Sequence, residues 1–238
     1  MILTSISLGN LTINEPITSL TDIFLSVIAF ILFSKVKKKC AKGFFFNSWA
    51  LFFLFMGIST SIGTFAHGFN DVWGSTIHNV LWMLMNMSVS MAVFFSMQAT
   101  ITFMGANNFW NRFFLIANII ILIGFIISTL AWNNFEILKI HTGIGVAVIF
   151  ITHVFALIKK HYGSGWIVVA FSLSLLTLLI HSYQISFSEW FNFKDISHVL
   201  MMMSLILIYI GVYRMSQNIN LSFRRENLTT TNQSESSN

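Results

Sequence analysis

The sequence predicts an all-α fold, a bundle of seven transmembrane helices with its N-terminus outside and its C-terminus in the cytoplasm. Three observations support this prediction. The first is composition, because 55% of the 238 residues are hydrophobic and 9% are charged, whereas soluble domains average about 25% charged residues. The second is a series of seven long apolar segments. The third is the distribution of basic residues among the connecting loops.

The seven segments each approach the length of about 20 mostly apolar residues that a transmembrane helix needs. They lie at 19–35, 48–69, 77–103, 112–132, 137–158, 166–186 and 196–214. Their short connections predict an up-and-down bundle in which consecutive helices run antiparallel. We therefore divide the chain into a short extracytoplasmic N-terminus (1–18), a seven-helix transmembrane domain (19–215) and a polar cytoplasmic tail (216–238). The tail has few aromatic residues, and we expect it to be disordered.

The basic residues give this bundle a direction. In the seven-segment arrangement, 11 of the 13 lysine and arginine residues fall on one side, and only Lys139 and Lys194 fall on the other. Because basic residues concentrate in cytoplasmic loops, this bias places the N-terminus outside. The net charge of +5 therefore reflects topology and gives no reason to expect nucleic-acid binding. The stretch KVKKK is in addition expected to attract anionic lipid. The single Cys40 excludes an internal disulfide and a cysteine-based metal site.

Histidine and carboxylate side chains gather at one depth, near the outer ends of six predicted helices. At ~1.5 Å of rise per residue they lie within roughly 10 Å of the outer boundary. The layer contains Asp22, His67, Asp71, His78, His141, His181, Asp195 and His198. Ionisable groups inside a membrane are costly, face the bundle interior or a cavity, and mark function. The layer therefore predicts an outward-facing polar site.

The residues at the start of the seventh segment could have a purely structural role instead of forming a functional site. Asp195 and His198 are three residues apart and so share one helix face. A single aspartate or histidine at a helix end can simply cap the helix or bond a loop. For each residue of the layer taken alone, this structural role stays open. The case for a site depends on the set.

Imidazoles together with carboxylates form the usual ligand set of zinc, and three protein ligands plus a water make a hydrolytic centre. We expect His67, His78, His181 and His198 to be metal ligands, with His141 and Asp22 as secondary candidates. Asp195 or Asp71 would orient a ligand or act as the general base. The sequence contains no contiguous motif such as HExxH. The zinc prediction therefore depends on separate helices bringing their histidines together.

The chain resembles the superfamily of seven-helix membrane hydrolases that includes the alkaline ceramidases and the progestin-and-adipoQ receptors. His67 matches that family's histidine in the second helix, although Gly63 stands where the family has a serine. The third helix has Asn86 where an aspartate is expected, and His198 is followed four residues later by Met202 and not by a second histidine. The resemblance implies an intramembrane zinc and hydrolysis of a lipid amide or ester, with membrane lipid as the partner and substrate.

The chain is also similar to uncharacterised bacterial seven-helix proteins, with TD opening the first segment and D-x-x-H opening the seventh. This similarity implies a bacterial inner-membrane protein and suggests no activity. Three further classes stay open. They are a haem protein that uses His67 with His141 or His181, a proton-coupled transporter or channel, and a receptor-like bundle without catalysis. The sequence gives no oligomeric state.

Overall fold

The computed structural model describes residues 4–9, 11–105, 109–132 and 135–235. In this part of the chain seven helices are long and apolar enough to cross a membrane, which confirms the predicted all-α bundle of seven spans. The helices are α1 (Pro16–Lys39), α2 (Phe44–Gly68), α3 (Asn70–Phe103), α4 (Phe109–Trp132), α5 (Phe135–Ile158), α6 (Ser164–Tyr183) and α7 (Phe193–Glu235). The backbone of α3 is interrupted at Gly74, where φ is 70°, and the apolar span begins there.

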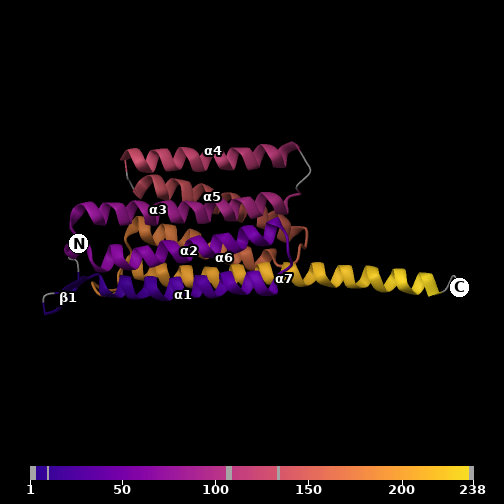
Figure 1. Cartoon of the computed structure of the whole chain (residues 1–238), viewed down its shortest axis with the longest axis horizontal. Helices are drawn as coiled ribbons and strands as arrows, with labels where there is room; N and C mark the ends of the chain where they lie inside the picture. The colour runs from indigo at the N-terminus through magenta and orange to yellow at the C-terminus, as the bar shows by residue number, and fades with distance from the viewer. Residues whose placement is uncertain (1–3, 10, 106–108, 133–134, 236–238) are drawn as a thin grey trace.

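The helices run up and down between two ends of the bundle (Figure 1). We call the end with the start of α1 and the α2–α3, α4–α5 and α6–α7 connections the histidine end. The opposite end, with the α1–α2, α3–α4 and α5–α6 connections, is the basic end. Trp49 and Phe53 of α2 and Leu25 of α1 are fully buried between these ends. Helix α4 lies at the edge of the bundle, beside α3 and α5 (Figure 1).

The charges follow the predicted separation. The basic end carries Lys35, Lys37, Lys38, Lys39, Lys42, Arg112, Lys159, Lys160 and Arg214. Arg224 and Arg225 lie further along α7, and their side chains are outside the described residues. Lys139 and Lys194 lie at the histidine end. The assignment of the basic end to the cytoplasm, and with it the bacterial inner membrane, stays a prediction.

A two-stranded hairpin precedes the bundle, and sequence analysis did not predict it within residues 1–18. Strand β1 (Ser5–Leu8) pairs antiparallel with β2 (Leu11–Asn14), with Ser5 opposite Asn14. Glu15 then takes a left-handed conformation, with φ 42° and ψ 54°. Pro16 follows as the first residue of α1, a position that suits proline because its fixed φ is helical and no amide hydrogen is needed. The hairpin thereby sets where α1 begins.

The other difference concerns the end of α7. This helix continues through Glu235, past the predicted end of the last span at 214, and extends beyond the other helices (Figure 1). Residues 215–235 contain neither proline nor glycine, so no residue there interrupts a helical backbone. The polar tail thus adds length to α7 outside the apolar span, which ends at Ile219.

Candidate functional site

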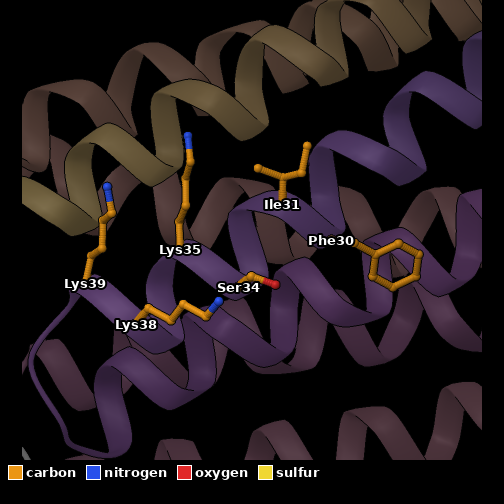
Figure 2. A pocket seen from close by; sticks show the side chains of 6 residues that line it. All are labelled: Phe30, Ile31, Ser34, Lys35, Lys38 and Lys39. Carbon is orange, nitrogen blue, oxygen red and sulfur yellow. The ribbon is translucent and has the colours of Figure 1, made fainter.

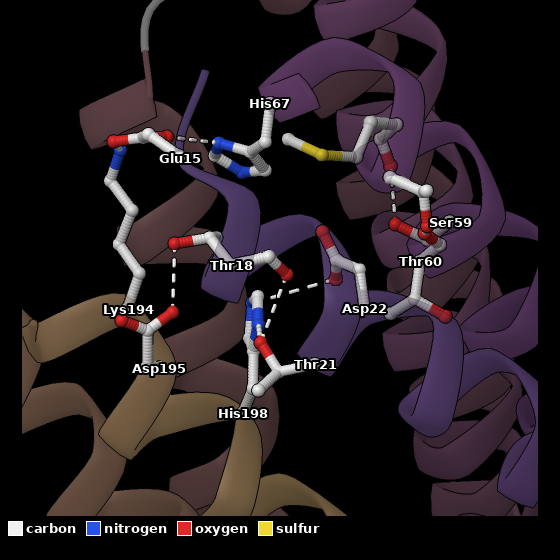
Figure 3. A network of polar contacts seen from close by, with 12 residues as sticks. Glu15, Thr18, Thr21, Asp22, Ser59, Thr60, His67, Lys194, Asp195 and His198 are labelled. Atoms are coloured by element: carbon white, nitrogen blue, oxygen red, sulfur yellow. Dashed lines mark hydrogen bonds and ion pairs between the residues drawn. The ribbon is translucent and has the colours of Figure 1, made fainter. Parts of the chain in front are cut away.

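The first polar cluster of the histidine end is centred on Glu15, a buried residue at the junction of the hairpin and α1. One carboxylate oxygen, Oε2, lies 2.7 Å from His67 Nδ1, and the other, Oε1, lies 2.5 Å from Lys194 Nζ. Burial alone would raise the pKa of Glu15, but the hydrogen bonds and charges of His67 and Lys194 outweigh it and lower the pKa to about 2. This Glu15 cluster ties α1 to the end of α2 and the start of α7 (Figure 3).

Asp195 is fully buried at the start of α7, and both of its oxygens accept hydrogen bonds. Oδ2 accepts from the backbone N–H of Asn192 at 2.8 Å, while Asn192 Oδ1 accepts from the backbone N–H of Lys194 at 2.8 Å. These reciprocal bonds resemble a capping box, which satisfies free amide groups at a helix start. Oδ1 accepts from the Thr18 hydroxyl of α1 at 2.8 Å. Asp195 therefore stabilises the start of α7 and joins it to α1.

The second cluster, the Asp22 cluster, lies beside the first and contains Thr21, Asp22 and His198 (Figure 3). The Thr21 hydroxyl lies 2.8 Å from His198 Nδ1, and the other ring nitrogen, Nε2, lies 3.5 Å from Asp22 Oδ1. Asp22 Oδ2 is buried and has no hydrogen-bond partner within the described part of the chain. A Cβ at Gly63 would lie 2.7 Å from this oxygen. Glycine at position 63 thus makes room for the Asp22 carboxylate.

A cavity of about 460 Å³ opens between these residues and the middle of the bundle. Its walls come from α2, α3, α5, α6 and α7, and Asp22 contributes from α1. Its charged and imidazole lining is confined to the histidine end, where it consists of Asp22, His67, Lys139, His181, Lys194 and His198. Further into the bundle the walls are mainly apolar, with Val93, Val146, Ile149, Phe171 and Ile208 among them.

The polar side chains that line the cavity differ in whether they have hydrogen-bond partners, according to their position along it. Hydroxyl groups further inside donate to backbone carbonyl oxygens and so offer little to a ligand; these are Ser59, Thr60, Ser96, Ser174 and Ser204. Near the histidine end, Thr142 Oγ1, Ser197 Oγ and Asp22 Oδ2 are buried without a hydrogen-bond partner among the described residues. Because buried polar atoms normally have partners, these three atoms mark the end of the cavity where a polar group is needed.

The structure brings together part of the predicted ligand set. His67, His181 and His198 line the cavity, as does the secondary candidate Asp22. His78 is not in the lining and stacks on Trp82, with the ring centroids 5.9 Å apart.

The remaining predicted residues lie apart from the cavity or are not described. His141 is buried between α4 and α5, with its ring centroid 4.7 Å from that of Phe125, and it does not line the cavity. Asp195 is also absent from the lining, since its oxygens cap α7 and bond Thr18. The side chain of Asp71 lies outside the described residues.

The geometry does not form a zinc site in this arrangement. Among the side chains that the structure describes, no three histidine, cysteine, aspartate or glutamate residues are grouped so that they could hold a metal ion. Two of the predicted ligands have a ring nitrogen engaged elsewhere, because His67 Nδ1 bonds Glu15 and His198 Nδ1 bonds Thr21. Zinc at this end therefore stays a prediction, and it would need these side chains to rearrange.

Several residues of the site were missed by sequence analysis. Glu15 lies in the segment taken as a short N-terminus, and Lys194 was used only for topology. Thr18 carried a usable signal, because it lies three residues before Thr21 and four before Asp22 and so shares a helix face with each of them. Thr142 and Ser197 carried none, since a hydroxyl inside a membrane helix ordinarily bonds the preceding turn.

Residues 17–217 match a family described as a family of unknown function (DUF6962). The chain belongs to this family. The match to DUF6962 covers the helical bundle and every residue that lines the cavity, while the hairpin and Glu15 precede it. No curated protein matches the chain. The DUF6962 match does not connect the chain to the ceramidase and adipoQ-receptor superfamily, so that resemblance also stays a prediction.

Proposed function

We propose that this protein binds an amphipathic, lipid-derived molecule in the cavity between its helices. The apolar part of the ligand would lie against the inner walls, and its polar group would lie at the histidine end. One observation carries the proposal: the hydroxyls further inside are satisfied by backbone, whereas Asp22 Oδ2, Thr142 Oγ1 and Ser197 Oγ are not. Cavities with mostly apolar walls and a few directed polar groups are the usual form of small-molecule sites.

The charges at the histidine end favour a neutral headgroup. Lys194 pairs with Glu15, and Lys139 lies 2.5 Å from Glu136 Oε1, so both cations have carboxylate partners. Asp22 offers an oxygen acceptor, and a buried acceptor left unpaired costs about 1–3 kcal/mol. A hydroxyl or amide headgroup can donate to this oxygen and also exchange hydrogen bonds with the two hydroxyls. A carboxylate or phosphate headgroup can only accept.

A photoreactive long-chain alcohol, with a diazirine in its alkyl chain, tests this proposal in protein reconstituted into phosphatidylcholine nanodiscs. Mass spectrometry of the labelled peptides should place the label on cavity-lining segments such as those around Met85 and Met201. Excess unlabelled long-chain alcohol should suppress the labelling, and an alkane of equal length should not. Label spread evenly over lipid-facing helix surfaces would contradict a defined site.

Two matched glycine variants sharpen the test. A Cβ at Gly143, which lines the cavity, would meet only Leu178 Cδ2 at 3.7 Å, so Gly143→Phe should fill the cavity without a clash at Cβ. Gly124 is on the exposed surface of α4, where an added Cβ has no neighbour within 4 Å among described atoms. Gly143→Phe should lower cavity labelling at least fivefold, and Gly124→Phe should leave it unchanged. Equal labelling in both variants would refute the cavity as the site.

Zinc-dependent hydrolysis of a lipid amide or ester is a second candidate. One observation favours it: Asp22, His67, His181 and His198 line the same end of one cavity. Elemental analysis of purified wild-type protein and of His198→Ala tests it. About one zinc per chain, lost in a variant that keeps its helix content, would support this class. Wild-type protein without stoichiometric zinc, purified in the absence of chelators, would exclude it.

A further inference from the structure

A second pocket lies at the opposite, basic end of the bundle, outside the cavity. It has a volume of about 360 Å³ and is lined by Phe30, Ile31, Ser34, Lys35, Lys38 and Lys39. All six residues belong to the last three turns of α1, and Figure 2 shows the three lysines at one side and Phe30 and Ile31 at the other. The pocket thus joins a basic rim to an apolar floor on a single helix.

The three lysines of the basic rim, Lys35, Lys38 and Lys39, pair with no acidic side chain in the part of the chain that the structure describes. The described helices and loops place Glu15, Asp22, Glu136, Glu189 and Asp195 at the histidine end. Glu226 and Glu235 follow further along α7, and their side chains are outside the described residues. Lys35 Nζ lies 5.8 Å from the ring centroid of Tyr209 on α7, which holds this ammonium beside the pocket. Three positive charges within about one turn therefore form a cluster that can attract an external anion.

The apolar floor continues away from the rim along α1. Ile31 is 48% exposed, and the same outer face carries the exposed side chains of Val27, Phe24 and Ile23 toward the middle of the span. In a membrane this face contacts acyl chains, while the lysines at the helix end lie at the level of the headgroups. A ligand that satisfies both parts must carry an anionic head and an alkyl chain.

We propose that this pocket binds an anionic phospholipid, with its phosphate between Lys35, Lys38 and Lys39 and one acyl chain along Phe30, Ile31 and the outer face of α1. The Ser34 hydroxyl lies between the two parts and can donate to a phosphate or ester oxygen (Figure 2). Lysines near an anionic membrane surface attract it electrostatically. The pocket adds a fixed place for one headgroup.

Native mass spectrometry of the detergent-purified full chain tests the site, with phosphatidylglycerol and phosphatidylcholine of identical acyl chains. The pocket variant combines Lys35→Gln, Lys38→Gln and Lys39→Gln. The control variant combines Lys37→Gln, Lys42→Gln and Lys159→Gln, which remove the same charge at the same end; Lys37 Nζ instead bonds Asn47 Oδ1 at 3.1 Å. Diffuse attraction, about fivefold per interfacial lysine, would be lost equally in the two variants. With a defined headgroup site, we therefore expect the pocket variant to bind phosphatidylglycerol at least about tenfold more weakly than the control variant.

Three results would overturn the proposal. Equal loss in the two triple variants would mean diffuse attraction without a pocket. Phosphatidylcholine binding as strongly as phosphatidylglycerol would remove the anionic head from recognition. Displacement of the lipid by an equal concentration of inorganic phosphate would show that the acyl chain contributes nothing. Ile31→Ser, which keeps all three lysines, should by itself weaken phosphatidylglycerol binding, so the apolar floor stays testable if the triple variant fails to insert.

Discussion

The Glu15 and Asp22 clusters lie side by side at the histidine end, yet they satisfy their carboxylates differently. Both oxygens of Glu15 face a cation or imidazole, at 2.5 and 2.7 Å. In the Asp22 cluster one oxygen lies 3.5 Å from His198 and the other has no partner among the described residues. In the first cluster both carboxylate oxygens are paired, and the cluster links the start of α1 to α2 and α7. The second is open toward the cavity, which is the property expected of a binding site.

The largest effect should come from removing the centre of the complete cluster. Glu15→Ala leaves His67 and Lys194 without their carboxylate, and removing one partner of a buried pair costs about 3–5 kcal/mol. The free energy of unfolding, followed by circular dichroism in detergent, should fall by about 3 kcal/mol. Glu136→Ala is the matched control, because the Glu136 side chain in its pair with Lys139 is 66% exposed, and its cost should be at most about 1 kcal/mol. Similar losses in the two variants would contradict a fastening role for Glu15.

The next effect should come from filling the space beside Asp22. A Cβ at Gly63 would lie 2.7 Å from Asp22 Oδ2, so Gly63→Val should displace the carboxylate and destabilise the bundle by about 1–3 kcal/mol. It should also lower cavity labelling by the long-chain alcohol. Gly124→Val provides the control, since its Cβ would meet no described atom within 4 Å. Unchanged labelling in Gly63→Val would separate Asp22 from the binding site.

The same substitution, aspartate to asparagine, can be compared at two positions of the histidine end, Asp195 and Asp22. Asp195→Asn removes a carboxylate oxygen that accepts from the Asn192 amide, and losing such a cap costs about 1 kcal/mol, with no effect on cavity labelling. Asp22→Asn should cost less stability, because its Oδ2 has no partner to lose in the described part. It should, however, reduce labelling severalfold. The reverse pattern would place the functional carboxylate at Asp195, as the sequence-based mechanism has it.

The smallest effect concerns pH. The pKa of Glu15 is about 2, compared with 4.5 ordinarily. A carboxyl group with a lowered pKa stabilises the fold fully above its unfolded pKa, and this contribution is lost as the pH falls toward the folded pKa. The melting temperature of the wild type should therefore fall more steeply between about pH 5 and pH 2 than that of Glu15→Gln. Parallel curves for the two proteins would show that Glu15 does not carry this dependence.

The features that the sequence predicts correctly are those that one local property decides. Apolar segment length gave the seven spans, with the third ending at Phe103 and the fourth at Trp132 as expected. The role of Glu15 was not predicted. In the sequence Glu15 resembles a loop residue, and only the hairpin before it and Pro16 after it direct its side chain into the bundle. The sequence placed Asp195 in the catalytic role and Asp22 among the secondary candidates, whereas Asp22, and not Asp195, lines the cavity. Depth along a helix is readable from residue spacing, but the partners of a side chain are not.

The sequence alone determined that the chain forms seven helices long and apolar enough to cross a membrane. It also determined that the histidines and aspartates gather near one end of these helices while most lysines gather near the other. These features follow from hydrophobic length and from position along each helix. Only the tertiary structure decided which side chains meet: Glu15 with Lys194, 179 residues apart, and Thr18 with Asp195, 177 residues apart. Helix rotation and packing set those contacts, because each helix can turn about its own axis without changing the depth of any residue.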